Sequence, residues 1–429
     1  MNNFGHVIKL ERIRRNMKQI TLAQGICTPS YLSKIENNSI VPSQEVVNLL
    51  LSRLELAINQ NKSLDDESYL KQIREIYFNA VMNKDRELTA IALKEINNER
   101  YLFKDSSNFY TYQLMVLRLT LIVQNAQNDT TELIMALSEL SSNFDEYQMF
   151  LFNSCLGSFY YFKHDFSLSL AAFEKAYKEH QNLSIEEWET ADFYYMLSII
   201  YIQHQRVVIS TEFIQKALAY FKDNFFYIRA VECYLVLAVA QKTSFKLDDA
   251  LETLLLAKRI AIQLNLEEQF TVIYHNLGAV MSLRGKSKEA IENYLESMTL
   301  SDRTEIKLIS VLSIVQEYSK QSNSLKVIEW SNKGLELLNE QHENGLIRFK
   351  HHFNIYISKN SNYVNFEKVV LNAIQYFKEA KDYLYTYKYY IFLAEYFNEI
   401  NKYKNAAKYY AASNKYLFLK NNYTSWEDL

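Results

Sequence analysis

Residues 156–176 read LGSFYYFKHDFSLSLAAFEKA, and the order of residue sizes in this stretch recurs along the chain. The order is apolar, small, large, small, large, small, at Leu156, Gly157, Tyr160, Ser169, Phe173 and Ala176. Further copies begin at Leu197-Ser198, Leu237-Ala238 and Leu277-Gly278, with only Gln241 breaking the order. The last copy comprises Leu393-Ala394, Phe397, Ala406, Tyr410 and Ser413. Such self-similarity indicates stacked units of one kind.

Each unit is predicted to be a pair of helices. Small residues let the two helices approach closely, and large residues fill the space to the next pair. The order resembles the tetratricopeptide pattern, whose period is about 34 residues. The first four copies start further apart than that, at Leu156, Leu197, Leu237 and Leu277, so longer helices or connections are expected. Weaker anchors extend the series to about nine hairpins, at Ile76, Val116, Ile314 and Ile355.

Glycine and proline are scarce, with 7 and 2 residues in a chain of 429. Folds rich in β-strands need these residues at most turns, so their scarcity favours long helices with short connections. We therefore predict an all-α chain. The hairpins are expected to stack into a right-handed superhelical array with a concave inner face.

Residues 1–60 are predicted to be a separate small helical domain, called the head below. A first helix is followed by a short second helix at Gln19–Gly25. Thr28 is a good N-cap residue, and Pro29 suits the first position of a third helix. A fourth helix is expected to start at Pro42-Ser43.

The head resembles the Xre/Cro-type helix-turn-helix. The resemblance is carried by QITLAQGICTPSYLSKIEN at residues 19–37 and by Pro42-Ser43. Lys18 departs from the pattern, because the family usually has a threonine or serine cap on the second helix. We expect weaker capping there, together with a positive charge directed at phosphate.

The resemblance implies that the third helix enters the major groove of double-stranded DNA. Carried over by position, the candidate base-reading residues are Pro29, Ser30, Ser33 and Lys34, and a lysine can read a guanine edge. Gln19 would anchor a phosphate or a base. The DNA-facing set is completed by Thr28, Lys18 and Arg14. The alternative for the two serines is that they only solvate an exposed helix.

Charge is distributed unevenly. The range 1–60 carries seven basic and four acidic side chains, a net charge of +3 within a total of −3, so the remaining chain carries −6. A basic head on an acidic body fits a head that contacts phosphates. The expected organisation is a head at 1–60, a linker at 61–72, repeats at 73–420 and a tail at 421–429.

A basic Xre-type head on an array with a longer period than the tetratricopeptide pattern resembles the RRNPP family of Gram-positive bacteria, which are cytoplasmic receptors for short imported signalling peptides. The resemblance implies a transcriptional regulator whose concave face binds a peptide of roughly five to ten residues. It also implies that the array mediates homodimers or tetramers.

Polar side chains beside the anchors are the candidates for peptide binding. A peptide in a groove needs donors and acceptors for its backbone, and asparagine supplies both. The candidates are Asn153, Asp192, Tyr195, Gln203, Glu232, Asn276 and Asn354. The two acidic members would engage a lysine, an arginine or the amino terminus of the peptide. For each residue alone, the alternative is a solvated helix position.

The sequence gives little support to catalysis or cofactor binding. It has no nucleophile elbow, phosphate loop or HExxH motif. The three cysteines lie far apart, so no metal site, disulfide framework or cofactor is expected. No apolar run is long enough to span a bilayer, and the start of the chain has no apolar signal segment, so we expect a cytoplasmic protein that does not enter a membrane. The competing hypothesis is a Rap-like protein that binds a response regulator and modulates its phosphorylation, with DNA binding secondary.

Overall fold

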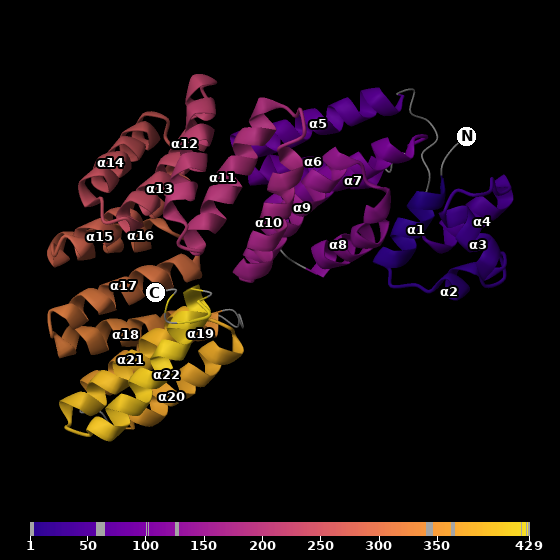
Figure 1. The fold of residues 1–429 in the computed structure, drawn as a ribbon. Coiled ribbons are helices and arrows are strands. Elements are labelled where there is room, and N and C mark those ends of the chain that lie inside the picture. The colour runs from indigo at the N-terminus through magenta and orange to yellow at the C-terminus, as the bar shows by residue number, and fades with distance from the viewer. Residues whose placement is uncertain are drawn as a thin grey trace. The chain divides into compact units, whose positions relative to one another are not determined.

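The computed structural model describes residues 4–56, 65–99, 101, 103–124, 128–339, 346–361, 365–421, 423–425 and 427. Throughout these ranges the regular structure is helical and contains no strand (Figure 1), which confirms the predicted fold class. The chain divides into two compact units, Met1–Val236 and Leu237–Leu429, and each is described by itself. Within the described ranges, every helix is too short or too polar to cross a membrane.

The head consists of four helices around one core. They are α1 (Phe4–Arg14), α2 (Gln19–Ala23), α3 (Pro29–Glu36) and α4 (Gln44–Arg53). Ile8, Leu22 and Leu32 are fully buried in this core. Gly5 is required where α1 crosses the end of α3, because a Cβ at this position would clash with the carbonyl oxygen of Ile35.

Eighteen further α-helices follow in the described part of the chain. In the first unit they are α5 (Asp66–Asn83), α6 (Arg86–Glu99), α7 (Ser106–Gln124), α8 (Asn128–Leu140), α9 (Glu146–Phe162), α10 (Phe166–His180), α11 (Glu187–Gln203) and α12 (Val207–Asp223). Helix α13 (Tyr227–Thr243) contains the division between the units. The second unit continues with α14 (Leu247–Gln263), α15 (Glu267–Leu283), α16 (Ser287–Leu300), α17 (Thr304–Lys320), α18 (Ser324–Asn339), α19 (Ile347–Asn360), α20 (Phe366–Glu379), α21 (Tyr383–Glu399) and α22 (Tyr403–Asn421). By their order in the sequence, these eighteen helices correspond to nine successive pairs, in agreement with the predicted array of about nine hairpins.

The long period of the repeat has a simple geometric origin. Helices α11 to α15 each have 17 residues. They start at positions 187, 207, 227, 247 and 267, so three residues form each connection. The middle residue of successive connections has a positive φ, at Gln205, Phe225, Phe245, Asn265 and Gly285. One left-handed residue thus reverses the chain after each helix, and two such steps make one repeat.

The small residues of the repeat lie where the two helices of a hairpin cross. A Cβ on Gly157 would come within 2.7 Å of the Phe173 ring, and a Cβ on Gly278 within 2.7 Å of the Tyr294 ring. In two hairpins a serine hydroxyl also donates to the opposite backbone, from Ser169 to the Gly157 carbonyl at 2.7 Å and from Ser210 to that of Ser198 at 2.8 Å. The predicted packing of small against large residues is therefore confirmed in these hairpins.

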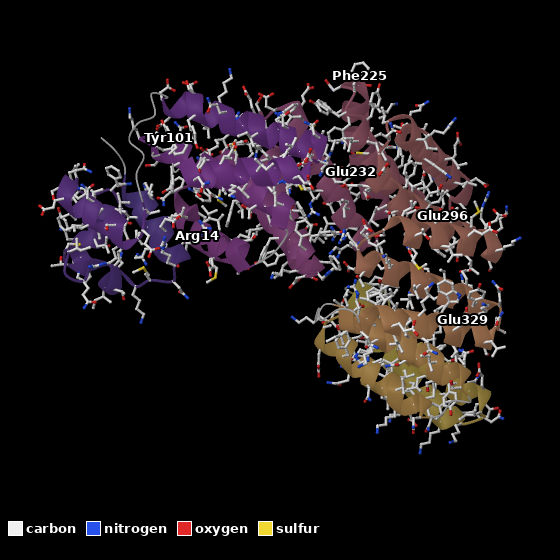
Figure 2. All side chains as sticks on the ribbon, turned by 180° about the vertical axis from the view of Figure 1, so that it is seen from behind. Arg14, Tyr101, Phe225, Glu232, Glu296 and Glu329 are labelled. Atoms are coloured by element: carbon white, nitrogen blue, oxygen red, sulfur yellow. The ribbon has the colours of Figure 1, made fainter. Side chains whose placement is uncertain are left out.

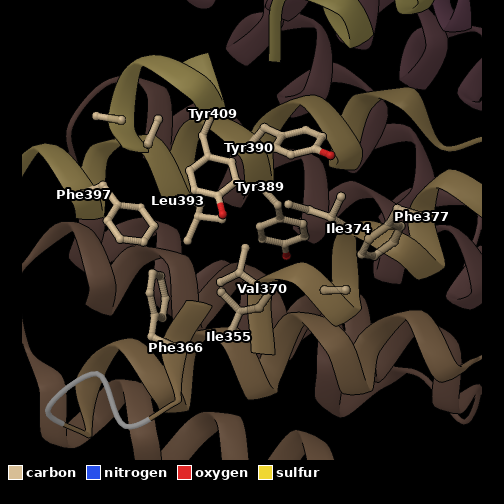
Figure 3. Packing of buried hydrophobic residues seen from close by; sticks show 13 residues of the cluster. Ile355, Phe366, Val370, Ile374, Phe377, Tyr389, Tyr390, Leu393, Phe397 and Tyr409 are labelled. Carbon is tan, nitrogen blue, oxygen red and sulfur yellow. The ribbon is translucent and has the colours of Figure 1, made fainter. Parts of the chain in front are cut away.

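One position predicted for the last hairpin is wrong, whereas Ala406 and Ser413 on the same helix are buried as expected. Tyr410 was expected to fill the gap between helices, but it is 39% exposed, whereas Tyr409 is 6% exposed. The Tyr409 ring lies in the core with Tyr390, Leu393 and Phe397 (Figure 3). Two adjacent tyrosines are equivalent in the sequence pattern, and only the rotation of α22 against α21 selects one of them.

The boundary between linker and repeats, predicted after residue 72, also differs from the observed start of the first repeat helix. Helix α5 starts at Asp66, so most of the range 61–72 is helical. The Asp65 carboxylate caps the helix by accepting from the Ser68 amide at 2.8 Å. The polar composition that suggested a linker belongs to the exposed face of the first turns of α5. Residues 57–64 lie outside the described ranges.

Replacing Gly157 or Gly278 by leucine is expected to destabilise the protein by about 1–3 kcal/mol, because the added side chain must displace an aromatic ring. Chemical denaturation measures this change in the free energy of unfolding. Ala171→Leu, at an exposed position of α10, is the matched control and should be nearly neutral. A neutral effect at both glycines would contradict the crossing described here.

Candidate functional site

The recognition element of the head is a capped and well-anchored helix. The Thr28 hydroxyl accepts from the Tyr31 amide at 3.2 Å, and Pro29 occupies the first turn of α3, as predicted. Lys18 precedes α2 with extended backbone and makes no side-chain cap, which agrees with the expected weaker capping. Leu32 and Ile35 hold the inner face of α3 in the core.

Most of the residues predicted to face DNA are solvent-exposed. Thr28, Pro29, Ser30 and Lys34 are exposed, as is Lys18, and Ser33 is half-buried. Arg14 is half-exposed, and its guanidinium lies 3.7 Å from the Glu11 carboxylate. Figure 2 shows Arg14 on the side of the head nearest the rest of the first unit. The outer surface of α3 is therefore free, whereas Arg14 lies at the edge of another surface.

One predicted residue is already engaged inside the head. The Gln19 amide donates to the Glu36 carboxylate at 2.7 Å, and Arg12 forms a forked pair with the same carboxylate at 2.6 and 3.0 Å. Glu36 is 1% exposed and joins α1, α2 and α3. Sequence reasoning missed this cluster. The signal was an acidic residue in the last turn of α3, where the helix dipole disfavours it unless a cation is near.

A buried charge cluster occupies the first unit. The Asp192 carboxylate of α11 accepts from Arg118 of α7 at 2.9 Å and from Arg229 of α13 at 2.8 Å. Arg229 is fully buried, and Asp192 is 2% exposed. Burial alone would raise the pKa of Asp192, but the two guanidinium groups outweigh it and lower that pKa. Asp192 thus has two internal cations as partners, and its contact with a peptide cation stays a prediction.

Two other predicted residues belong to the same cluster. Glu232, labelled in Figure 2, lies 3.3 Å from Arg229 and 3.9 Å from Lys84. The Tyr195 ring lies under the Arg229 guanidinium, with 4.6 Å between the guanidinium carbon and the ring centroid. Glu232, Tyr195 and Lys84 keep partial exposure, so a ligand can reach these members of the cluster. The prediction missed these basic partners. Lys84 and Arg118 are far from Asp192 in the sequence, and Arg229, although it shares α13 with Glu232, lies 37 residues from Asp192.

The remaining candidates differ in accessibility. Asn153 is 5% exposed, and its amide donates to Glu179 at 3.0 Å. Gln203 is exposed at the end of α11, and Asn354 is half-buried on α19. Asn276 is 9% exposed and donates to the Val272 carbonyl of its own helix at 3.0 Å. Asn276 and Asn354 belong to the second unit, and the other candidates belong to the first.

Two buried polar atoms of the second unit were not predicted to lack partners. Gln241 is the residue that breaks the repeat order, and its side-chain oxygen is buried without a hydrogen-bond partner among the described residues. The Nδ1 atom of His275, beside Asn276 on α15, is in the same state. Burial and the nearby Lys242 lower the pKa of His275 to about 4, so its ring is neutral. Buried polar atoms normally have partners, which makes this pair an exception.

A buried carboxyl group with a raised pKa lies beside the charge cluster. Glu189 is 4% exposed and accepts from the Tyr147 hydroxyl at 2.7 Å. Burial raises the pKa of Glu189 to about 7, although the hydrogen bond from Tyr147 opposes the shift. Among the described residues, no group of histidine, cysteine and acidic side chains is arranged to hold a metal ion.

Comparison with known proteins identifies the class. Residues 8–59 match the helix-turn-helix family model. The chain is 30% identical over 372 residues to the transcriptional activator NprA of Geobacillus stearothermophilus, an alignment that covers 84% of this chain and 91% of NprA. A helix-turn-helix head joined to helical repeats, with such a relative, defines a transcriptional regulator rather than an enzyme.

The chain belongs to the RRNPP family of regulators. Solved structures agree with its fold. A Rap protein complexed with competence and sporulation factor has a TM-score of 0.70 at 17% identity, covering 83% of this chain and 99% of that one. NprR in complex with its cognate peptide NprX has a TM-score of 0.64 at 16% identity, covering 81% of this chain and 99% of that one.

Asp192→Asn should destabilise the protein by about 3–5 kcal/mol, because Arg118 and Arg229 then lose their shared counter-charge while remaining buried. The free energy of unfolding in denaturant measures the loss. Glu212→Gln removes one member of an exposed pair with Lys216 and should cost at most about 1 kcal/mol. Equal effects of the two substitutions would contradict the structural role of Asp192.

Glu189 predicts a specific dependence of stability on pH. The folded-state pKa of Glu189 lies above the usual value, so folding favours the protonated carboxyl group. The resulting contribution to the free energy of unfolding is complete at low pH and is lost as pH rises through about 7. The wild-type protein should therefore lose up to about 3 kcal/mol relative to Glu189→Gln between about pH 5 and pH 8. Thermal unfolding of both proteins across this range measures the difference. Parallel curves would show that the carboxyl group is already ionised at pH 5.

Proposed function

We propose that this regulator binds double-stranded DNA through α3 and that a short signalling peptide, bound on the inner face of the hairpins, controls it. The regulatory class follows from the family, and the DNA contacts and the peptide are the proposed steps. The protein would act as a homodimer or tetramer, because helix-turn-helix dimers read two half-sites about one helical turn apart.

The arrangement of the head supports DNA binding. The polar side chains near the start of α3 point to solvent, while Glu36 holds the other end against α1 and α2. A recognition helix must be rigid to place its side chains against base edges. Lys34 combines exposure with positive charge, which suits a guanine edge. Lys18 and Arg14 would then contact phosphates.

The observation that carries the peptide proposal is the polar break in the repeats. Gln241 occupies a position where other copies have a large residue, and its oxygen is buried without a partner among the described residues, like Nδ1 of His275. Departures from local packing rules concentrate at functional sites. A peptide backbone offers donors that would satisfy both atoms. In the other unit, Glu232 and Tyr195 remain partly accessible. The solved structures with this fold include a Rap protein complexed with competence and sporulation factor and NprR in complex with its cognate peptide NprX.

Lys34→Ala should weaken binding to the operator by about 1–3 kcal/mol and relax its sequence preference, because a base contact is lost. Lys18→Ala should weaken binding to all sequences and reduce its salt dependence, because a phosphate contact is lost. Titration of labelled duplexes at several salt concentrations separates the two effects. Unchanged operator binding in a Ser30/Ser33/Lys34 triple alanine variant would refute the assignment of α3.

Asn276→Ala and Gln241→Ala are expected to reduce peptide affinity by about 1–3 kcal/mol each, through loss of desolvated hydrogen bonds. Calorimetry would use synthetic peptides from the short reading frame next to the gene. Asn414→Ala, at an exposed position of α22, is the matched control. If no such peptide binds, the receptor proposal fails. Binding of a response regulator that survives deletion of residues 1–60 would then favour the Rap-like alternative.

A further inference from the structure

Helix α1 has two apolar faces. Phe4 and Ile8 lie one turn apart on the face that enters the core of the head. His6, Leu10 and Ile13 lie at spacings of three and four on the opposite face, which we call the second face of α1. Leu10 is only 1% exposed, yet it is not part of the core of the head. Something outside the head therefore covers it.

The covering surface is the hairpin formed by α7 and α8. Helix α1 packs along α8 within the same compact unit (Figure 1). Nδ1 of His6 lies 2.6 Å from the Tyr110 hydroxyl of α7, and the two rings meet edge to face with centroids 5.1 Å apart. Tyr110 is itself 2% exposed. The contact thus combines apolar burial with a specific polar pair.

The protonation states suit this pair at neutral pH. Burial, assisted by Lys9, lowers the pKa of His6, and burial raises the pKa of Tyr110. A neutral imidazole with its proton on Nε2 accepts through Nδ1, and a protonated phenol donates. The hydrogen bond therefore joins two uncharged groups and needs no buried charge.

The recognition surface is left open by this contact. Among the described helices of the head, only α1 packs extensively on the hairpins, and α2, α3 and α4 pack within the head. Ser30 and Lys34 stay exposed while Leu10 is covered. The contact therefore does not block DNA. Besides this contact, the head is joined to the hairpins by the chain itself, through residues 57–64 between α4 and α5.

We propose that the second face of α1 is a docking surface for the α7–α8 hairpin, through which the hairpins set the orientation of the DNA-binding head. Packing does not fix the orientation of an undocked head, whereas a docked head takes only the orientation that the hairpins impose. This docking stands independently of the proposed function. The use of this docking in regulation does rest on the proposed function, since a change in the hairpins would reposition two heads relative to two half-sites.

Distance measurements between spin labels test the docking itself. Labels would be placed at Ser52→Cys in the head and Glu139→Cys in α8 of the full chain, with Cys27→Ala removing the half-buried cysteine. We expect one narrow distance distribution in this parent protein. Leu10→Asp should broaden it, because a buried carboxylate opposes docking, whereas Leu49→Asp, at a 46% exposed leucine of α4, should leave it narrow.

Tyr110→Phe provides a second variant, in which the head itself is unaltered. It removes only the hydrogen bond to His6, so a smaller broadening is expected. A broad distribution in the parent protein would overturn the proposal. A narrow distribution retained in both Leu10→Asp and Tyr110→Phe would also overturn it.

DNA titration then tests the regulatory use. Leu10→Asp should weaken binding to a complete operator about tenfold or more and leave binding to a single half-site unchanged, because only the relative orientation of two heads is lost. Equal effects on both duplexes, or no effect on either, would refute the use of docking in regulation. If no variant, including the parent, binds DNA at all, the proposed function fails, while the distance measurements still decide whether the head docks.

Discussion

Two helices can approach closely only where one of them lacks a bulky side chain, and this constraint determines the hairpins of this protein. At Gly157 and Gly278 the space of a side chain is taken by an aromatic ring of the second helix. The ring then fills the volume between hairpins, so a single pairing of small and large residues defines both the crossing within a hairpin and part of the packing around it. Helices of equal length, joined by equally short connections, repeat this geometry at a constant interval from α11 to α15.

The first unit adds a constraint of a different kind. Asp192 draws together side chains from α7 and α13, and both partners are buried, Arg118 at 7% and Arg229 at 0% exposure. Buried ion pairs contribute little net stability compared with apolar packing, but breaking one is costly. Such a cluster therefore specifies one arrangement of these helices more than it strengthens the fold. Glu232 and Tyr195 lie at its accessible edge, so a ligand that contacted them would act on the same helices.

The head shows how one short helix serves two purposes. One face of α1 completes the core of the helix-turn-helix, and the other lies on the α7–α8 hairpin. Glu36 keeps the recognition helix rigid relative to α1 through Arg12. Movement of α1 would consequently be passed to α3 as a rigid body, without rearrangement inside the head.

Sequence alone determined the features that depend on local chemistry and on period. The positions of Thr28 and Pro29 predicted the start of α3, and the recurrence of small and large residues predicted nine hairpins, because capping and close approach are set by residue type and spacing. The family could also be predicted from the sequence, since the head carries a specific motif. The exposure of Ser30 and Lys34 on α3 also followed from the same motif.

Tertiary structure decided whatever depended on the rotation of helices or on residues distant in the chain. The sequence pattern could not choose between Tyr409 and Tyr410, because adjacent residues differ only by the angle at which the helix is seated. Asp192 appeared to be a free groove carboxylate, because its partners Arg118 and Arg229 are 74 and 37 residues away in sequence. Whether a charged residue faces a ligand or an internal counter-charge is set by the packing of several helices. Local pattern carries no information on that packing.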